Sequence, residues 1–270
     1  MIAARKEPDP APRHDGIALL DIGNSTVALG IWSEAKVQRV RSFPHDRTDK
    51  VKAALKALAA ASTKGFLPGV AVASVVPDTL ERMTRWIEQQ LMIEPLVVGR
   101  QIPLPIEITV EAPETVGVDR VCNAAAAFEG NKRACVVVDC GTAITIDVVD
   151  DDGALIGGAI YPGLKMQAAA LHRQTAVLPQ VTPIAPPEII GSNTVNAICS
   201  GIYYGTAGAV RGIVEAYATH LNRWPDVIAT GGDAELLSAE CNIFDAVVPN
   251  LCLIGIGLAY NRRLDNAVTL

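Results

Sequence analysis

Hydrophobic positions along the chain follow two alternating spacings, and this alternation predicts an α/β fold. Short β-branched runs that end at Asp, Gly or Pro predict strands, whereas apolar residues three or four positions apart predict helices. The predicted strands cover residues 16–21, 27–33, 36–42, 70–75, 96–98, 154–160, 227–230 and 246–248, and two more form a hairpin within 136–147. The predicted helices cover residues 48–62, 79–91, 164–175, 195–222 and 251–264, and two more begin at 121 and just after 234. Asp78 is the expected N-cap of the predicted helix 79–91.

The hairpin within residues 136–147 carries the first candidate chemistry. Its first apolar run ends at Asp139, Gly141 and Thr142 follow in the turn, and the second run ends at Asp147. Glycine lets backbone N–H groups approach an anion closely, and Thr142 adds a hydroxyl donor. The Asp139 carboxylate suits a cation that accompanies a phosphate, because hard cations take oxygen ligands. The plain alternative is an ordinary hairpin in which Asp and Thr only serve the turn.

A second copy of this pattern lies near the N-terminus. An apolar run ends at Asp21, Gly23 and three polar residues follow, and residues 27–32 are again apolar. Two phosphate-type hairpins about half a chain apart predict a duplicated fold that holds a ligand between its halves. The expected parts are a disordered tail over residues 1–15, an N-terminal half over 16–125 and a C-terminal half over 126–270.

Composition and charge narrow the classes of partner. Of the 270 residues, 50% are hydrophobic and 19% charged, which is typical of a globular chain. The net charge of -6 and the absence of a Lys/Arg run argue against nucleic acid as a partner. No apolar stretch is long enough for a membrane span, and the polar N-terminal segment does not resemble a signal peptide. The six cysteines include no C-x-x-C pair and lie in apolar runs, so we expect buried thiols in a cytoplasmic protein.

Residues 113–128 offer a candidate catalytic segment at the start of a predicted helix. Gly117, Asp119 and Arg120 lie there, and a helix N-terminus attracts anions through its free N–H groups. In one interpretation Asp119 is a catalytic base and Arg120 binds an anionic part of a substrate. In the other, Asp119 caps the helix and Arg120 faces solvent.

Glycines mark two further features. The predicted strand 227–230 leads into Gly231 and Gly232 and then a helix, which is a weak signal for a nucleotide site. Within the predicted helix 195–222, glycines recur at helical spacing and predict close packing against another element, either of this chain or of a partner subunit. These glycines are Gly201, Gly205 and Gly208.

Six short strings occur in an order that resembles the type III pantothenate kinases of the sugar kinase, Hsp70 and actin superfamily. They are D-I-G-N-S (21–25), P-E-T-V-G-V-D-R (113–120), D-C-G-T-A-I-T (139–145), G-G-A-I-Y-P-G (157–163), G-S-N-T (191–194) and T-G-G-D-A (230–234). The resemblance covers nearly the whole chain after the first fifteen residues. It implies duplicated ribonuclease H-like (actin-like ATPase) domains with the ligand cleft between them.

The resemblance also implies ATP-dependent phosphorylation of the primary hydroxyl of pantothenate, the first step of coenzyme A synthesis. Asp119 would accept the proton, and Asp139 would bind a monovalent cation, K⁺ or NH₄⁺. Mg²⁺ would arrive with ATP, with Asp21 a hypothetical ligand, and the protein would be a homodimer with substrate sites near the subunit interface. The implied ATP-binding residues are Asp21, Ile22, Gly23, Asn24, Ser25, Thr26, Val27, Ala28 and Thr142. The implied pantothenate-binding residues are Gly117, Val118, Asp119, Arg120 and Thr194.

The chain departs from the family pattern at a few positions. Val110 stands where many members carry a Tyr that touches substrate, Ile144 replaces a frequent Thr, and Ser25–Thr26 vary a common Thr-Asn. Val110 removes a hydroxyl from the expected pocket, so a same-fold kinase for another small hydroxyl substrate is an alternative. A nucleotide-binding regulatory protein without turnover is another, although such a protein has no need of a base at Asp119. A nucleic-acid-binding regulator has the least support.

Overall fold

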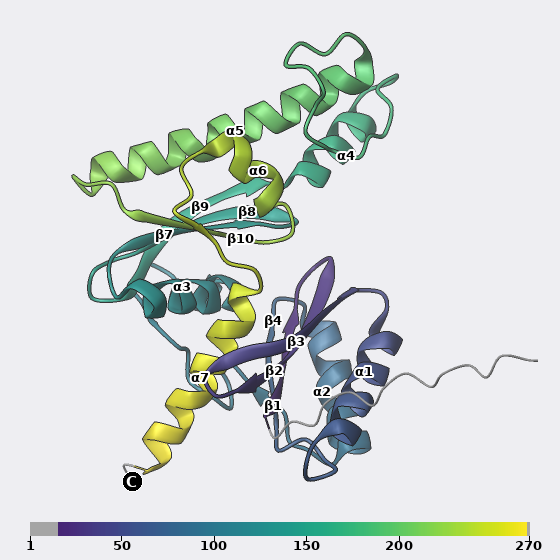
Figure 1. Cartoon of the computed structure of the whole chain (residues 1–270), viewed down its shortest axis with the longest axis vertical. Coiled ribbons are helices and arrows are strands. Elements are labelled where there is room, and N and C mark those ends of the chain that lie inside the picture. The colour runs from purple at the N-terminus through teal and green to yellow at the C-terminus, as the bar shows by residue number, and fades with distance from the viewer. Residues whose placement is uncertain (1–15, 269–270) are drawn as a thin grey trace, which may run out of the picture. The chain divides into compact units, whose positions relative to one another are not determined.

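The computed structural model describes the chain from residue 16 to residue 268, with side chains described as far as residue 264. The expected disordered tail, residues 1–15, lies outside the described residues. The contacts of the chain group it into two compact units, Met1–Ile102 and Pro103–Leu270. Each unit contains its own sheet and its own helices (Figure 1).

The first unit is built around a five-stranded sheet with the order β3-β2-β1-β4-β5. Its strands are β1 (Ile17–Ile22), β2 (Thr26–Ser33), β3 (Lys36–Pro44), β4 (Val70–Ser74) and β5 (Leu96–Val97). The first three strands pair antiparallel, and β4 and β5 continue from β1 in parallel. Helices α1 (Thr48–Ala61) and α2 (Pro77–Leu91) pack Leu55, Met83 and Ile87 into one core with the sheet. Their apolar residues lie at the helical spacing that the sequence shows.

The second unit repeats this strand order. The series β9-β8-β7-β10-β11 corresponds strand by strand to β3-β2-β1-β4-β5, and β6 adds an outer strand beside β9. The strands are β6 (Glu107–Ile108), β7 (Cys135–Cys140), β8 (Ala143–Val149), β9 (Ala154–Pro162), β10 (Asp226–Thr230) and β11 (Ala246–Val247). The strand directions repeat too, antiparallel through β7, β8 and β9 and parallel through β7, β10 and β11. This repetition confirms the predicted duplicated α/β fold.

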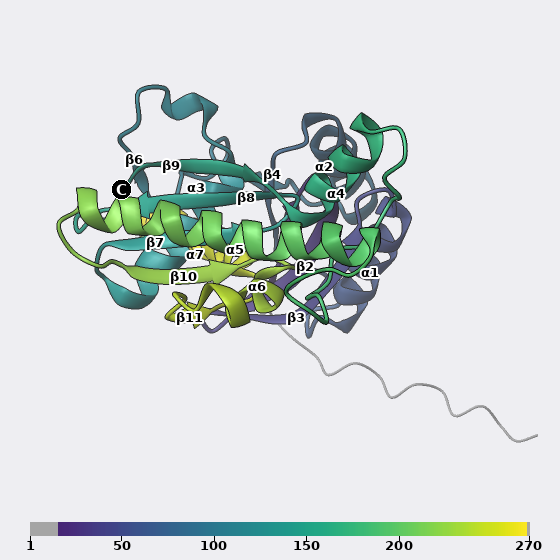
Figure 2. The same cartoon turned by 90° about the horizontal axis from the view of Figure 1, so that it is seen from above.

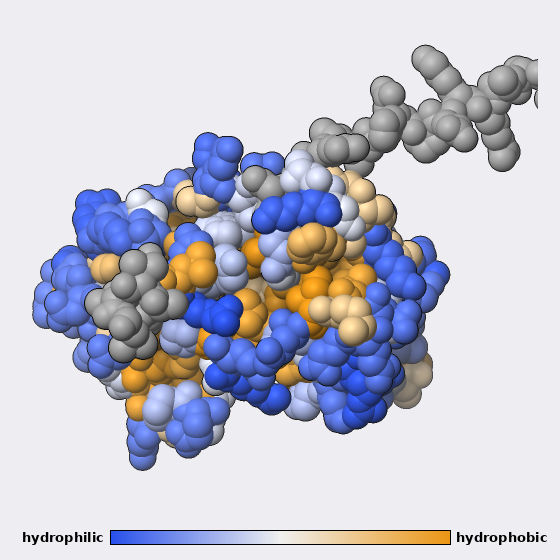
Figure 3. Space-filling model, turned by 90° about the horizontal axis from the view of Figure 1, so that it is seen from below, coloured by the Kyte–Doolittle hydropathy of each residue, from blue (hydrophilic) through white to orange (hydrophobic). Residues whose placement is uncertain are grey.

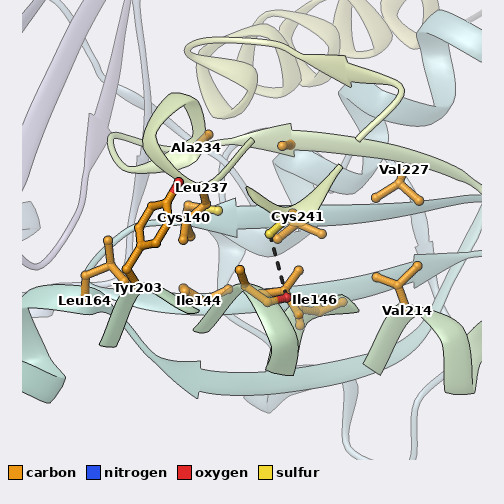
Figure 4. Packing of buried hydrophobic residues seen from close by; sticks show 14 of the residues in the cluster. Cys140, Ile144, Ile146, Leu164, Tyr203, Val214, Val227, Ala234, Leu237 and Cys241 are labelled. Carbon is orange, nitrogen blue, oxygen red and sulfur yellow. Dashed lines mark hydrogen bonds between the residues drawn. The ribbon is translucent and has the colours of Figure 1, made fainter. Parts of the chain in front are cut away.

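Helices cover both faces of the second sheet. Helices α4 (Leu164–Gln174), α5 (Thr194–His220) and α6 (Ala234–Cys241) lie on one face, and α3 (Val118–Asn131) and α7 (Leu251–Val268) lie on the other (Figures 1 and 2). Figure 4 shows the core on the α5 face, where Tyr203, Leu237 and Cys140 are among the buried side chains. Val137 packs into the opposite core. Because β7 is buried on both faces, its sequence is an unbroken apolar run as far as Asp139.

Two helices begin earlier than the sequence pattern predicts. Helix α2 begins at Pro77 with Val76 as its N-cap, so the prediction that Asp78 is the N-cap is wrong. Proline suits this first position because its fixed φ is already helical and its missing N–H needs no partner. Helix α3 begins at Val118 instead of residue 121, which places Asp119 in its first turn.

The division between the two units falls between Ile102 and Pro103. The predicted boundary of the halves, between residues 125 and 126, lies inside α3. Helix α3 packs against α7 and β7, and β6 pairs with β9, so both elements belong to the second unit by their contacts. The position at which the duplicated halves meet in the sequence stays a prediction.

The glycines of α5 lie on its exposed face. A Cβ atom built at Gly201, Gly205 or Gly208 would meet no neighbouring atom within 4 Å, whereas Ile202 and Val210 of the same helix are buried. Within the described part of the second unit, these glycines therefore serve no close packing against another element. Packing against a partner subunit stays a prediction.

The surface agrees with the charged composition. On the face that Figure 3 shows, hydrophilic residues surround smaller hydrophobic patches. Among residues 16–268, none of the helices combines the length and the apolar character that crossing a membrane requires.

Candidate active site

Charged side chains of α3, β7 and β8 meet on one face of the second sheet. Strand pairing places Asp139 opposite Thr145 and Val137 opposite Asp147. Residues two apart on a strand share a face, so Asp139 and Asp147 both point to the side that α3 covers. The first turns of α3 bring Arg120 and Asn123 to this face, where they hydrogen-bond Asp147 and Asp139. Asp119 lies close enough for its negative charge to raise the pKa of Asp139. The cluster unites three residues that the sequence analysis selected with two that it left without a role.

Arg120 and Asp147 form an ion pair at the centre of the cluster. The Arg120 Nε atom donates to both carboxylate oxygens of Asp147, at 2.9 and 3.2 Å, and Nη2 donates to Oδ1 as well. Asp147 is 1% exposed and the Arg120 side chain 16% exposed. The hydrogen bond with Asp147 raises the pKa of Arg120, so the guanidinium stays charged. The alternative in which Arg120 faces solvent is wrong.

Burial and pairing act in opposite directions on Asp147. Burial raises the pKa of Asp147, and the hydrogen bonds from Arg120 and Thr145 lower it. Gly158 on β9 makes room for this side chain, because a Cβ atom there would lie 2.5 Å from Asp147 Oδ1 and 2.4 Å from the Ile146 carbonyl oxygen. The second glycine of the Gly157–Gly158 string thus has a packing role beside the ion pair.

Asp139 is held at the end of β7 by a buried amide. The Asn123 Nδ2 atom donates to Asp139 Oδ2 at 2.8 Å, and Asn123 is only 2% exposed. Burial, followed by the negative charge of Asp119, raises the pKa of Asp139 to about 6. Gly231 closes over the carboxylate: its φ is +95°, and a Cβ atom there would lie 2.5 Å from Asp139 Oδ1. Both observations require glycine at this position.

Asp119 differs from Asp147 in its partners. Its Oδ1 atom accepts the backbone N–H of Arg120 at 2.8 Å, and the N-cap of α3 is Gly117, which has no side chain to cap with. Burial raises the pKa of Asp119 above the ordinary value, against the opposing effect of Arg120. A carboxylate with a raised pKa is a better proton acceptor near neutral pH than an exposed one. Burial also raises the pKa of Asp139 and Asp147. Those two carboxylates accept hydrogen bonds from the side chains of Asn123 and Arg120. The hydrogen bond to Asp119 comes from the main chain, so Asp119 is the carboxylate of the cluster that is suited to general base catalysis.

Three segments meet next to the carboxyl end of β7. The Gly141 N–H donates to the Ala143 carbonyl oxygen at 3.1 Å and closes the tight turn. The Gly163 N–H donates to the Thr142 carbonyl oxygen at 3.2 Å, and the Asp233 N–H to the Cys140 carbonyl oxygen at 3.0 Å. The turn of the β7–β8 hairpin, the end of the 157–163 string and the 230–234 string are thus neighbours. Thr142 is exposed in this turn.

The corresponding turn of the first unit joins β1 to β2. The Gly23 N–H donates to the Thr26 carbonyl oxygen at 2.9 Å, and Asp21 at the end of β1 pairs with Ala28 of β2. The polar residues 24–26 are exposed, whereas Ile22 and Val27 are fully buried. Of the predicted ATP-binding residues, Ile22 and Val27 therefore present almost no accessible surface to a ligand.

Thr194 lies apart from the charged cluster, in another part of the second unit. It is the first residue of α5, and Asn193 caps the helix by accepting the Asn196 N–H at 2.9 Å. Thr194 lines a groove of about 580 Å³ between α4 and α5, together with Gln167, Leu171 and apolar residues of α5. Asp119 is not among the residues that line this groove.

Sequence reasoning missed Asn123 and Asp147 as members of the site. A signal existed for Asp147, because a charged residue inside a buried β-branched run is rare unless it is paired. Asn123 carried no comparable signal, since its Ala-rich surroundings fit an ordinary buried helix. Its role depends on facing the end of β7, a contact between residues 16 positions apart.

The cluster has an excess of negative charge and an unused oxygen. The cluster holds three carboxylates, those of Asp119, Asp139 and Asp147, and one guanidinium. The Asn123 Oδ1 atom is buried without a hydrogen-bond partner. Carboxylate and amide oxygens are ligands that hard cations accept. Among the described residues, however, no group of three or more His, Cys, Asp or Glu side chains is arranged to hold a metal ion. The residues fit a cation only in part, and further oxygen ligands would come from elsewhere.

Comparison with known proteins places the chain in a family. A sequence profile described as type III pantothenate kinase matches residues 17–216. Among solved structures, the activator of 2-hydroxyisocaproyl-CoA dehydratase from Clostridium difficile, with bound ADPNP, is 12% identical with a TM-score of 0.54, covering 94% of this chain and 98% of that one. Component A of (R)-2-hydroxyglutaryl-CoA dehydratase from Acidaminococcus fermentans is also 12% identical with a TM-score of 0.54, covering 92% and 98%.

A third solved structure shares more of the sequence. A Campylobacter jejuni protein described as a conserved member of the Baf family of transcriptional activators is 22% identical with a TM-score of 0.50, covering 94% of this chain and 100% of that one. At these identities the likeness shows a common fold, that of the actin-like ATPases and sugar kinases.

Proposed function

The chain belongs to the type III pantothenate kinase family, and from that premise we propose that it transfers a phosphoryl group from ATP to the primary hydroxyl of pantothenate. The observation that carries the proposal is the cluster on α3, in which Asp119 has a raised pKa beside a buried Arg120–Asp147 pair. Phosphoryl transfer depends mainly on positioning and on neutralised charge. In this proposal Asp119 is the base, and the Arg120 guanidinium, held by Asp147, is the positive charge beside it.

Each residue has a separate task in this proposal. Asp119 accepts the hydroxyl proton of pantothenate as the oxygen attacks the γ-phosphorus. The bond from that phosphorus to the β–γ bridging oxygen breaks, and ADP leaves. Arg120 uses Nε and Nη2 for Asp147, and we propose that Nη1 faces the substrate. Asp147 is thus a positioning residue, because it holds the guanidinium without contacting the substrate. Gly117 and Val118 offer main-chain groups at the start of α3.

We assign the phosphates of ATP to the two Gly-containing turns, residues 21–28 and Thr142. Exposed N–H groups and hydroxyls of such turns bind anions. Mg²⁺ supplies charge neutralisation when it arrives with ATP, with Asp21 as a proposed ligand. A monovalent cation, K⁺ or NH₄⁺, would be held through Asp139 with the Asn123 Oδ1 atom nearby.

The test is a phosphorylation assay with purified protein, ATP, Mg²⁺ and pantothenate, in K⁺ and in Na⁺ buffers. We expect K⁺-dependent product from the wild type and a loss of about a hundredfold or more in kcat for Asp119→Asn, the usual range for a general base. Asp152→Asn, in an exposed turn of the same unit, is the matched control and should keep full activity. Absence of product from the wild type under these conditions would contradict the proposal.

Val110 motivates a second candidate, a kinase for another small hydroxyl compound. Val110 is half-buried just before the turn that leads into α3. It has no hydroxyl to hydrogen-bond a polar substrate group. A screen of hydroxyl acceptors tests this candidate: an acceptor with a higher kcat/KM than pantothenate would replace pantothenate as the substrate, whereas ATP binding without any transfer would favour a regulatory protein.

We also propose a cytoplasmic homodimer that forms through the exposed face of α5. Gly201, Gly205 and Gly208 place no side chain on this face and leave open space above it. Ile189 and Ile190 beside it are 70% and 85% exposed. Ser200 holds the loop that carries them by donating to the Ile189 carbonyl oxygen. Gly205→Arg should convert the dimer to a monomer in analytical ultracentrifugation, while Gly130→Arg, at an exposed position in the last turn of α3, should not. A monomeric wild type would contradict the dimer.

A further inference from the structure

The turn between β1 and β2 is held from outside by His45, a residue that follows β3. The His45 Nδ1 atom lies 2.7 Å from the Gly23 carbonyl oxygen, and Nε2 lies 2.9 Å from Thr79 Oγ1. The His45 backbone N–H donates to the Ser25 carbonyl oxygen at 2.9 Å. Residue 45 therefore binds two carbonyl groups of the turn and links the turn to the first turn of α2. All of these contacts lie within the first unit.

The partners of the imidazole determine where its hydrogen lies. A carbonyl oxygen can only accept, so His45 Nδ1 carries a hydrogen and donates to Gly23. In the neutral ring Nε2 is then an acceptor, and the Thr79 hydroxyl donates to it. Arg82 Nη2 donates to the same Thr79 oxygen at 3.1 Å, which leaves the hydroxyl hydrogen for His45. Thr79 is 1% exposed, so this hydroxyl is shielded from water.

Because the peptide bond is planar, the hydrogen bond to the Gly23 carbonyl also determines the direction of the Asn24 N–H group. In a trans peptide the C=O group and the following N–H group point in opposite directions. Because the Gly23 carbonyl points at His45, the Asn24 N–H points away from it, on the exposed side of the turn. The Ser25 carbonyl is also bound by residue 45. The carbonyl oxygens of Gly23 and Ser25, which would repel an anion, are thus held on the side of the turn that faces His45, away from the Asn24 N–H.

We infer that His45 is a positioning residue for phosphate binding: it holds the Gly23–Asn24 peptide so that the Asn24 N–H faces a phosphate group of ATP. The inference rests on the proposed function, in which this turn binds ATP. It goes further by assigning the orientation of the turn to the side chains of His45 and Thr79, which lie outside the turn and outside every motif of the sequence.

The test measures the Kd of Mg·ATP by titration calorimetry, and the KM of ATP and of pantothenate by the phosphorylation assay. His45→Leu removes the donor, and we expect the Kd and the KM of ATP to rise about tenfold, the value of one hydrogen bond to a partly buried acceptor. The KM of pantothenate and kcat should not change. His45→Asn places an amide N–H where Nδ1 lies and should restore the Kd to within about threefold of the wild type.

Two further variants keep the inference falsifiable. His220→Leu, at an exposed position on α5, is the control and should bind Mg·ATP like the wild type. Thr79→Val keeps His45 but removes the hydroxyl that holds its Nε2 atom, and it should weaken ATP binding even if His45→Leu does not fold. The inference is overturned if folded His45→Leu, or Thr79→Val, binds Mg·ATP as tightly as the wild type, or if His45→Asn binds as weakly as His45→Leu.

The outcomes also separate this inference from the proposed function. A wild type that binds Mg·ATP but never phosphorylates pantothenate contradicts the proposed function and leaves the Kd comparison intact. A wild type that phosphorylates pantothenate, with unchanged Kd values in the variants, contradicts the inference alone. A wild type that does not bind Mg·ATP contradicts both.

Discussion

At the scale of single residues, two neighbouring carboxylates have different partners and therefore different chemistry. Asp147 receives two guanidinium nitrogens of Arg120, whereas Asp119 receives one backbone N–H. Burial raises the pKa of both groups. Removing one member of a buried ion pair leaves an uncompensated charge, so Asp147 and Arg120 hold each other in place. Asp119 is not held by a guanidinium in this way and can exchange a proton.

The raised pKa of Asp119 predicts a pH dependence. A general base must be ionised, so kcat/KM for pantothenate should fall as the pH decreases from neutral, and the fall should begin above the ordinary pKa of an Asp, 3.8. The measurement is the pH profile of kcat/KM from mildly acidic to mildly alkaline solution. The binding of Mg·ATP, followed in parallel, controls for titration of the nucleotide. A profile that stays flat down to the ordinary Asp pKa would remove Asp119 as the base.

Asp139 should lower the stability of the ligand-free protein at neutral pH. Its pKa rises from 3.8 in the unfolded chain to about 6 in the folded one. The folded state therefore binds the proton more tightly, and the associated stability is present below 3.8 and lost as the pH rises through 6. At about pH 8 the ionised group costs about 3 kcal/mol. Asp139→Asn should then be more stable than the wild type.

Urea unfolding without ATP or K⁺ measures this difference. The stability advantage of Asp139→Asn should disappear below the unfolded pKa, where both side chains are neutral. Asp152→Asn, exposed and outside the cluster, should show no comparable advantage. Equal stability of Asp139→Asn and the wild type at alkaline pH would show that the buried charge is already compensated.

At the scale of elements, close approach between strands decides which glycines the site needs. Gly158 lies on β9 directly against the Asp147 side chain. In Gly158→Ala the new methyl group would lie 2.5 Å from Asp147 Oδ1, so the strand or the ion pair must move. We expect a loss of about 1–3 kcal/mol in the free energy of unfolding and a lower kcat/KM for pantothenate.

Gly130→Ala is the matched control for this substitution. Gly130 lies in the last turn of α3, and a Cβ atom there would meet nothing within 4 Å. Alanine favours a helix over glycine by up to about 1 kcal/mol, so this variant should be as stable as the wild type or more stable. Chemical denaturation and the phosphorylation assay on both variants decide the matter. Equal behaviour of the two would contradict the packing role of Gly158.

At the scale of the whole molecule, the two units repeat one strand order but have separate cores. All six cysteines belong to the second unit and are buried. Burial raises the pKa of Cys135 to about 12 and of Cys241 to about 11, and it raises that of Cys140 as well. The native protein should therefore react with a thiol reagent only as fast as the second unit opens.

Labelling with a chromogenic disulfide across a urea series tests this prediction. The rate should be low in native buffer and should rise with the loss of helical circular dichroism. A short peptide that contains one cysteine gives the rate for an open thiol. Labelling of the native protein at the peptide's rate would contradict the burial of these cysteines.

The sequence by itself determined the local elements and most of the catalytic candidates. Hairpins such as β7–β8 and helices such as α1 are made by residues close in sequence, so their spacing was enough to predict them. Asp119, Arg120 and Asp139 were identified in the same way, through short strings at strand and helix ends. The duplication followed from two similar strings, and the repeated strand order confirms it.

Only the tertiary structure decided what these residues face. Arg120 meets Asp147 from 27 positions away, His45 meets Gly23 from 22, and the α5 glycines are exposed. Such contacts depend on which face of a strand or helix turns toward which neighbour. That choice is made by burying apolar area over the whole unit, a sum that no short stretch of sequence contains.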